Sequence, residues 1–477
     1  MFYEKFKIRW DLMTKDTTKV LLKNTMWFGI GNFGSKILSF LLVPLYTNYL
    51  TPYEFGKIDL MITTINLLVY ICTLSIGDAV FRFCLDDNEN KEVIFNSGIF
   101  VIIVSSVAIC FIYPIIIRYF QDWGYFWILY ICISLVGFLT MFLQATQKTK
   151  IFATQGILYT FSLSILNIVL LMKIKLGVSG YFISMIVAYI LSIIFICIQG
   201  RIYILFKLNA IKKEIIFKML RYSIPLVPAS VAWWIIASMD RYMIAYMYGE
   251  GATGLYAAAQ KIPTIIAVLN SFFIKAWQIS AVKIKEYSDS SEYFSNLYKI
   301  LMSIGFLLSF LLVLTSKVIS KFFLAREFFV AWEMIPCLVA SSLFSAISLF
   351  IGAQFTAYKK SFLHLTSNAL AMFFNFLFNY IFLKIIGPVG ATLATMFSFF
   401  IVLTYRQVKV GQLMIFKYDK LIFYLNSFLL MTSCIFMALD IKNWERIAIS
   451  LFAIFVGINY KDYKRIILKL ISYRKQT

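Results

Sequence analysis

The chain has 477 residues, of which 61% are hydrophobic and 14% are charged, and its mean hydropathy is +0.82. A soluble domain of this composition would expose large apolar patches to water and aggregate, so the composition indicates a protein that resides in lipid. The formal net charge of +22 would suggest a nucleic-acid partner for a soluble protein, but here it fits Lys and Arg retained in cytoplasmic loops, and we expect no nucleic-acid binding.

Transmembrane helices account for most of the chain. A helix that crosses a bilayer needs about 20 mainly apolar residues, and about fourteen segments satisfy that length. The first follows a polar, basic start that lacks the pattern of a cleavable signal peptide, so we expect it to be retained. The predicted spans are residues 22–47, 58–81, 94–117, 123–146, 151–172, 178–200, 222–247, 255–280, 294–316, 331–353, 361–383, 388–405, 421–439 and 444–460. The expected fold is an all-α integral membrane protein without a sizeable soluble domain.

The basic residues between the spans predict the orientation of the chain. If the N-terminus is cytoplasmic, the inner segments hold roughly three times as many Lys and Arg as the outer loops, which is the bias of the positive-inside rule. Both termini are therefore expected in the cytoplasm. Segments 201–221 and 461–477 place apolar and basic residues at helical spacing, which predicts amphipathic helices on the inner leaflet with their basic faces toward anionic headgroups.

A lysine lies midway along the first span. Asn32, Lys36 and Ser39 follow one another at spacings of four and three, so they form one polar stripe of a helix. A charge in mid-membrane costs about 2.5–3.5 kcal/mol on insertion scales, so we expect this stripe to face a cavity and bind substrate. The alternative is a lysine whose long side chain reaches the interface.

Asp78 and Arg82 lie one helical turn apart at the inner end of the second span. They are candidates for closing the inner mouth of a cavity, and an ordinary pair at a helix end is the alternative. Asp59, near the outer end of the same span, is expected to be interfacial. The acidic run within 86–92 is interpreted as a solvated inner loop, with a partner-binding role as the alternative.

Charged residues recur in the seventh and eighth spans. Asp240 and Arg241 are neighbours in the outer part of the seventh span, and helical neighbours point about 100° apart. We expect Arg241 to contribute to a cationic cavity and Asp240 to pair with Lys261 as an outer gate, with a purely structural ion pair as the alternative. The eighth span carries a second polar stripe that we assign to substrate binding: Lys261, Thr264, Ser271 and Lys275. Its two lysines could instead extend to opposite interfaces.

The two halves of the chain repeat weakly. Five residues recur at a shift of 210 positions: Gln144, Thr146, Lys150, Gly177 and Gly180 reappear as Gln354, Thr356, Lys360, Gly387 and Gly390. The shift moves the chain by six spans, an even number, so corresponding helices run in the same direction. An earlier turn ending at Gly56 corresponds loosely to one ending at Gly254.

This repeat predicts two parallel six-helix lobes around a central cavity. The expected parts are an N-terminal lobe (1–200), an amphipathic cytoplasmic linker (201–221), a C-terminal lobe (222–405), helices 13 and 14 (406–460) and a basic cytoplasmic tail (461–477). Paired lobes favour transport by alternating access.

Several kinds of site lack the residues they need. None of the seven cysteines forms a CxxC pair and His364 is the only histidine, so we expect no metal site, haem or disulfide framework, and no catalytic residues. No GxxxxGK[ST] motif occurs, so energy must come from an ion gradient with H⁺ or Na⁺ as coupling cation, from the membrane potential, or from consumption of the product outside. The candidate cavity residues are mainly cationic and would attract anions, particularly phosphate.

Several stretches resemble the polysaccharide flippases of the multidrug/oligosaccharidyl-lipid/polysaccharide exporter superfamily. They are GNFGSKILSFLLVPLYTNYLTPYEFG, DRYMIAYMYGEGATGLYAAAQKI, and the turns LGVSG and IGPVGATLAT. The resemblance covers nearly the whole chain in span order. It implies that the protein moves an undecaprenyl-pyrophosphate-linked oligosaccharide repeat unit across a bacterial cytoplasmic membrane, for O antigen, capsule or a related surface polysaccharide. It implies the polysaccharide polymerase and chain-length machinery as partners, besides the lipid bilayer.

The resemblance also implies that Lys36 and the Asp240–Arg241 pair occupy family positions. Many relatives have Arg near the end of the first span where this chain has Asn48, which leaves open how many cations hold the pyrophosphate. One alternative shares the fold: a drug exporter, which would show acidic cavity residues, or the flippase of the peptidoglycan precursor. Another is a membrane glycosyltransferase or polysaccharide polymerase, which usually needs sizeable outer loops; the longest here, 317–330, has Glu327 as its only acid.

Overall fold

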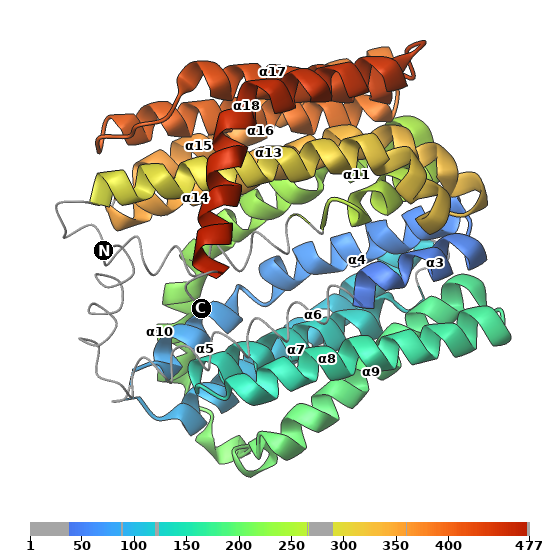
Figure 1. The fold of residues 1–477 in the computed structure, drawn as a ribbon. Coiled ribbons are helices and arrows are strands. Elements are labelled where there is room, and N and C mark those ends of the chain that lie inside the picture. The colour runs from blue at the N-terminus through green and yellow to red at the C-terminus, as the bar shows by residue number, and fades with distance from the viewer. Residues whose placement is uncertain are drawn as a thin grey trace. The chain divides into compact units, whose positions relative to one another are not determined.

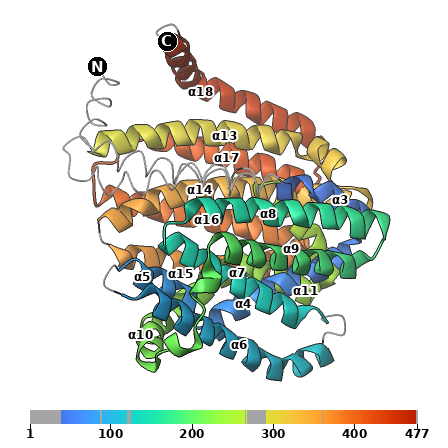
Figure 2. The ribbon, with the colours of Figure 1, turned by 90° about the horizontal axis from the view of Figure 1, so that it is seen from below.

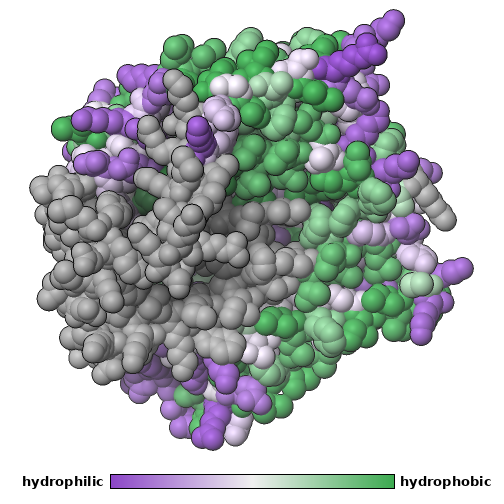
Figure 3. Space-filling model, in the orientation of Figure 1, coloured by the Kyte–Doolittle hydropathy of each residue, from purple (hydrophilic) through white to green (hydrophobic). Residues whose placement is uncertain are grey.

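The computed structural model describes residues 38–86, 89–119, 124–264, 266, 290–358 and 360–474. These residues form helices joined by short turns, and no strand occurs among them (Figures 1 and 2). The all-helical prediction is confirmed. Large apolar side chains such as Phe111 and Phe428 are exposed along the helices, and hydrophobic surface dominates the described atoms of Figure 3. Such a surface is stable in contact with lipid and not in contact with water.

Eleven helices in the described part of the chain are long and apolar enough to cross a membrane. The predicted first span and most of the eighth fall on residues that the structure does not describe. The predicted last span, 444–460, is the beginning of α18 (Trp444–Arg474), which is not among the eleven. The helix also continues through most of the predicted tail, so helix 14 and residues 461–474 form one element.

The chain divides into two compact units. Unit 1 comprises residues 1–45 and 61–234, and unit 2 comprises residues 46–60 and 235–477. Unit 1 contains α5 (Ile76–Cys84), α6 (Lys91–Tyr119), α7 (Phe126–Ala145), α8 (Thr149–Asn167), a π-helical turn (Ile168–Lys173), α9 (Gly177–Gln199), the 3₁₀ turns Ile202–Ile204, Leu208–Ala210 and Ile224–Leu226, and α10 (Lys213–Ser223). Unit 2 contains α13 (Ser290–Phe323), a 3₁₀ helix (Arg326–Met334), α14 (Ile335–Ala357), α15 (Ser361–Ile386), α16 (Val389–Gly411), α17 (Lys420–Ala438) and α18.

Three helices cross the boundary of the units: α3 (Val43–Tyr49), α4 (Pro52–Cys72) and α11 (Val227–Lys261). The division therefore differs from the predicted lobe limits, because the beginning of α4 packs with unit 2 while the rest of that helix belongs to unit 1. The site described below lies at this beginning of α4.

The predicted second span, 58–81, is interrupted. Helix α4 ends at Cys72, and Leu74 and Ser75 adopt positive φ angles of 53° and 51° before α5 begins at Ile76. Thr73 donates its hydroxyl to the carbonyl of Val69 at 2.6 Å and so occupies a carbonyl at the helix end. The break places Asp78 and Arg82 on a separate short helix.

The linker 201–221 packs against α5 and the beginning of α6 within unit 1. The Asn96 side chain donates to the carbonyl of Leu205 at 2.7 Å and accepts from the backbone N–H of Lys207 at 3.0 Å. Lys207 pairs with Glu92 at 3.1 Å, and Lys218 pairs with Glu89. Two glutamates of the acidic run thus pair with partly exposed lysines of the linker, and the interpretation of the run as a solvated loop stays a prediction.

The repeated glycines form similar turns in the two units. Gly177 and Gly387 both have positive φ angles, 55° and 77°, which side chains rarely adopt. Three residues later, a Cβ on Gly390 would lie 2.2 Å from the carbonyl oxygen of Phe382, and one on Gly180 would lie 3.3 Å from that of Leu170. Each turn therefore uses one glycine for its backbone angle, and the second glycine is required for close helix approach at Gly390, whereas a Cβ at Gly180 would displace its neighbours only slightly.

Candidate functional site

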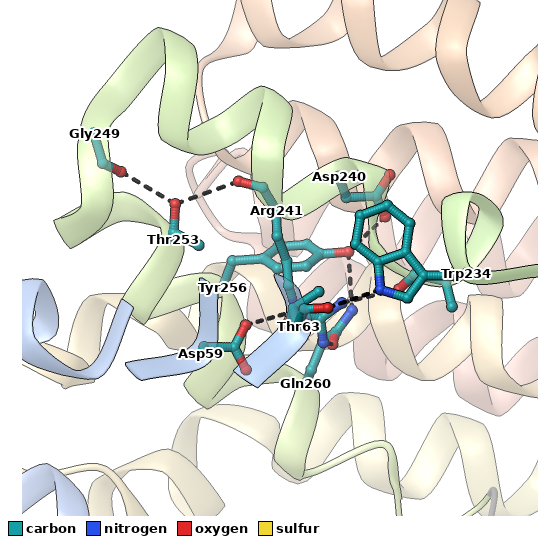
Figure 4. A network of polar contacts seen from close by, with 10 residues as sticks. Asp59, Thr63, Trp234, Asp240, Arg241, Gly249, Thr253, Tyr256 and Gln260 are labelled. Atoms are coloured by element: carbon teal, nitrogen blue, oxygen red, sulfur yellow. Dashed lines mark hydrogen bonds and ion pairs between the residues drawn. The ribbon is translucent and has the colours of Figure 1, made fainter. Parts of the chain in front are cut away.

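Helix α11 is a hairpin of two helices that reverses at Gly249. This glycine has φ 84° and ψ 177°, which no α-helix contains. In a straight helix, Asp240 and Tyr256 would lie about 24 Å apart. The Tyr256 hydroxyl nevertheless donates to Asp240 Oδ2 at 2.7 Å, and Thr253 bonds to the carbonyl of Arg241 at 3.5 Å (Figure 4). The reversal agrees with the predicted division into a seventh and an eighth span.

Asp240 is buried among neutral donors. Its carboxylate accepts hydrogen bonds from Tyr256 (2.7 Å) and Thr395 (2.7 Å) on Oδ2, and from Asn379 Nδ2 (2.6 Å) on Oδ1. Only 4% of the residue is exposed. The predicted Asp240–Lys261 ion pair is wrong, because among the described residues no cation lies within ion-pair distance of Asp240 and three neutral donors occupy its oxygens.

Arg241 turns away from Asp240 and pairs with Asp59. Its Nε donates to Asp59 Oδ2 at 2.6 Å, its Nη1 to the carbonyl of Ala237 at 2.9 Å, and its Nη2 to Gln260 Oε1. The Asp59 and Arg241 side chains are only 16% and 15% exposed, and the expectation that Asp59 lies at the membrane interface stays a prediction. Adjacent helical residues do point in different directions here, as their spacing predicts.

Two glycines bring α4 and α11 into backbone contact near this ion pair. A Cβ on Gly56 would lie 1.9 Å from the carbonyl oxygen of Glu250, and one on Gly254 would lie 1.8 Å from that of Pro52. These are the glycines that the repeat matched loosely, and within unit 2 they pack against each other. We call the contacts of Gly56 with Gly254 and of Asp59 with Arg241 the α4 anchor.

Further contacts in unit 2 hold the segment before the anchor. The Thr47 hydroxyl donates to the carbonyl of Phe323 at 3.3 Å and accepts from the N–H of Ala325 at 3.1 Å. The ring of Phe55 packs edge-on against Phe328, with centroids 5.8 Å apart. The chain from residue 46 to 60 is therefore attached to unit 2 by hydrogen bonds, apolar packing and one shielded ion pair.

Adding a methyl group at the anchor should destabilise it. Gly56→Ala and Gly254→Ala each place Cβ in contact with a carbonyl oxygen, so we expect a loss of about 1–3 kcal/mol in the free energy of unfolding. Gly251→Ala is the matched control, because its Cβ meets nothing within 4 Å. Thermal unfolding in detergent measures the difference, and equal melting temperatures for all three variants would contradict the close approach.

The other predicted site residues fall into three groups. Asn32, Lys36, Ser271 and Lys275 lie outside the described residues. Ser39 is exposed near the beginning of the described chain, and the Thr264 hydroxyl donates to the carbonyl of Lys261 within its own turn. Lys261 lies close enough to Asp59 and Arg241 to interact electrostatically with both.

The candidates for an inner gate are not joined. Asp78 and Arg82 are both described and share one turn of α5, yet no ion pair forms between them. Asp78 is half-buried and Arg82 is exposed. Their gating role stays a prediction.

The sequence interpretation missed most partners of Asp240 and Arg241. Asn375 and Asn379 lie one turn apart in an aromatic-rich span, and that i, i+4 pair of amides was an available signal. The predicted twelfth span, 388–405, ends just before Arg406, but α16 extends beyond it to Gly411. There it is buried and donates to Ser348, Ser367 and Asn368, which are all neutral acceptors.

The described residues contain no group of three or more His, Cys, Asp or Glu side chains able to hold a metal ion together. The polar cluster around Asp240 is of another kind, with one carboxylate and several neutral oxygens. Asn379 Oδ1 is buried there and has no hydrogen-bond partner, which is costly for a polar atom. An oxygen-lined site with an unsatisfied acceptor suits a hard monovalent cation or a proton.

Sequence and structure comparisons give consistent matches. A family profile described as "Polysaccharide biosynthesis protein" matches residues 21–278. A search of curated proteins found no match. Among solved structures, the chain is similar to "Lipid II flippase MurJ, inward closed conformation", with a TM-score of 0.67 and 16% identity over 92% of this chain and 99% of that chain.

Transporters of other substrates share the fold. A multidrug resistance MATE family transporter of the MOP superfamily, in an inward-facing conformation, has a TM-score of 0.61 and 14% identity over 79% of this chain and 95% of that chain. A MOP superfamily transporter from Pyrococcus furiosus has a TM-score of 0.58 and 14% identity over 83% and 96%. At these identities the likeness shows the fold alone.

Proposed function

The chain belongs to the polysaccharide biosynthesis protein family, and we propose that it moves an undecaprenyl-pyrophosphate-linked oligosaccharide repeat unit across the bacterial cytoplasmic membrane by alternating access. The family match carries this proposal, and the matched residues, 21–278, include both sides of the α4 anchor. The chain is a multi-pass membrane protein with a transporter fold. A pyrophosphate that crosses hydrocarbon needs cationic partners, whereas its prenyl tail can remain in lipid.

Arg241 and Lys261 are the described cations that support an anion substrate. Asp59 pairs with Arg241 and lies close to Lys261, so its single carboxylate offsets part of their positive charge while the anchor is formed. When the anchor separates, the two positive charges become available to a phosphate. Lys36, Asn32, Ser39, Thr264, Ser271 and Lys275 complete the proposed substrate-binding set.

The likeness to a Lipid II flippase favours a peptidoglycan-precursor flippase as the second candidate, since the matched structure covers 92% of this chain. Depletion of the protein in its host separates the candidates. We expect surface polysaccharide to disappear while lipid-linked repeat units accumulate and cells stay intact. Lysis with accumulated peptidoglycan precursor would support the second candidate, and unchanged surface polysaccharide with raised drug retention would contradict both.

Asp240, Asn375, Asn379 and Thr395 are the residues that we propose hold a coupling cation, Na⁺ or H⁺. They form one buried cluster, in which Asn379 Nδ2 donates to Asp240 Oδ1 and Asn375 Oδ1 and the Thr395 hydroxyl donates to Asp240 Oδ2, and the unsatisfied Asn379 Oδ1 supports the fit. A cation there would balance the Asp240 charge, which only neutral donors now solvate. We also place the polysaccharide polymerase and chain-length machinery among the partners, and both termini in the cytoplasm.

A further inference from the structure

An unbroken chain of hydrogen bonds connects Asp240 to the α4 anchor. Arg241 Nη2 donates to Gln260 Oε1, Gln260 Nε2 donates to the Tyr256 hydroxyl at 3.0 Å, and Tyr256 donates to Asp240 Oδ2 at 2.7 Å (Figure 4). Tyr256 is fully buried. The helical hairpin at Gly249 creates this connection, because it brings the second helix of α11 beside the first.

The hydrogen bonds of this connection can have only one donor-to-acceptor direction, from Arg241 to Asp240. A guanidinium is only a donor and a carboxylate is only an acceptor, so the two ends fix every bond between them. Gln260 must present its oxygen to Arg241 and its amide nitrogen to Tyr256. Tyr256 must then donate its single proton to Asp240. A change of charge at Asp240 therefore alters the bond that Tyr256 makes, and through Gln260 the environment of Arg241.

Arg241 consequently has two negative partners, one direct and one indirect. Asp59 touches it, and Asp240 reaches it through two neutral side chains. When Asp59 separates, the charged Asp240 still stabilises Arg241, so the anchor opens at lower cost. When Asp240 is neutral, Arg241 would be left buried and uncompensated, so opening costs more.

We propose that Tyr256 and Gln260 are positioning residues that couple the charge at Asp240 to the α4 anchor. Neutralisation of Asp240, by a cation or by substitution, favours the anchored state, and by linkage the anchored state favours neutralisation. Because α4 continues from unit 2 into unit 1, the anchor is a point at which that coupling reaches the rest of the chain. The meaning of this coupling for transport rests on the proposed function.

The test measures anchor opening on the purified full chain, without substrate. Thr47→Cys places a thiol at a buried position of segment 46–60, which contains the α4 side of the anchor. The rate at which this thiol reacts with a methanethiosulfonate reagent reports how often the segment separates from the rest of unit 2. The less buried Cys72, Cys110 and Cys197 are replaced by Ala in this background. We expect Asp240→Asn to slow the reaction about fivefold.

Breaking the connection should remove that response. In Tyr256→Phe and in Gln260→Met backgrounds, we expect Asp240→Asn to change the rate less than about twofold. Tyr298→Phe is the matched control: it also removes a buried tyrosine hydroxyl, which accepts from Gln407 and lies off this path, and it should keep the fivefold response.

A fivefold response that persists in both Tyr256→Phe and Gln260→Met would overturn the proposal, and so would an unchanged or faster reaction in Asp240→Asn alone. These outcomes concern the anchor only. If depletion of the protein instead left surface polysaccharide unchanged, the proposed function would be overturned and the measured coupling would remain intact.

Discussion

Exchanging the charges of Asp59 and Arg241 is expected to restore activity that either single reversal abolishes. Asp59→Arg or Arg241→Asp places two like charges at a site where the side chains are only 16% and 15% exposed. Breaking a shielded pair in this way costs about 3 kcal/mol, which corresponds to more than a hundredfold shift in the anchored population. Surface polysaccharide, measured at matched protein abundance, should vanish in each single variant and return in part in the double variant.

The return should be partial because Gln260 must reorient. With Asp at position 241, the Gln260 amide would donate toward it and could no longer donate to Tyr256. The exposed pair Lys207–Glu92 is the matched control, since its exchange should change little. A double variant as inactive as both singles would remove the ion pair from the mechanism.

Asp240→Asn is expected to reduce transport at least about tenfold without unfolding the protein. Asparagine matches the shape of aspartate, and loss of a buried charge removes an electrostatic cost. It should nevertheless abolish the proposed cation site, because its amide nitrogen would face either the donor Asn379 or the donors Thr395 and Tyr256. Glu333→Gln, a half-buried carboxylate outside this cluster, is the control.

Thermal unfolding provides a second measurement for Asp240. Ligands that bind only the folded state stabilise it, by about 2.7 kcal/mol at a hundred times the dissociation constant. Replacing choline with Na⁺ should therefore raise the melting temperature of the unmodified protein and not of Asp240→Asn. If both proteins respond equally to Na⁺, the cation does not bind at Asp240; if neither responds to Na⁺ but transport follows the pH gradient, the coupling cation is the proton.

The sequence predicted the membrane class and most spans, because apolar runs of about 20 residues are a strong and local signal. It also identified Asp240 and Arg241 as important, since charges are rare inside spans. It paired them wrongly, because the partners depend on the reversal at Gly249, on α4 lying beside Arg241, and on α15 and α16 lying beside Asp240. Sequence spacing does not encode those tertiary contacts.

The glycines show the same limit. The turns repeated at Gly177 and Gly387 follow from the local preference of glycine for positive φ angles, which a sequence can reveal. The contact of Gly56 with Gly254 depends instead on two segments almost 200 positions apart crossing at a distance that excludes any side chain. The repeat indicated that these glycines correspond, but only the structure shows that they touch.

Transport of the lipid-linked glycan by the purified protein tests the central claim most directly. The chain is reconstituted in liposomes with an undecaprenyl-pyrophosphate-linked oligosaccharide, and a glycosidase added outside reports how much of the lipid becomes accessible. We predict that the protein exposes the inner-leaflet pool and that the Asp59→Arg variant does not. An inner pool that stays protected in the presence of folded, correctly inserted protein would contradict the account.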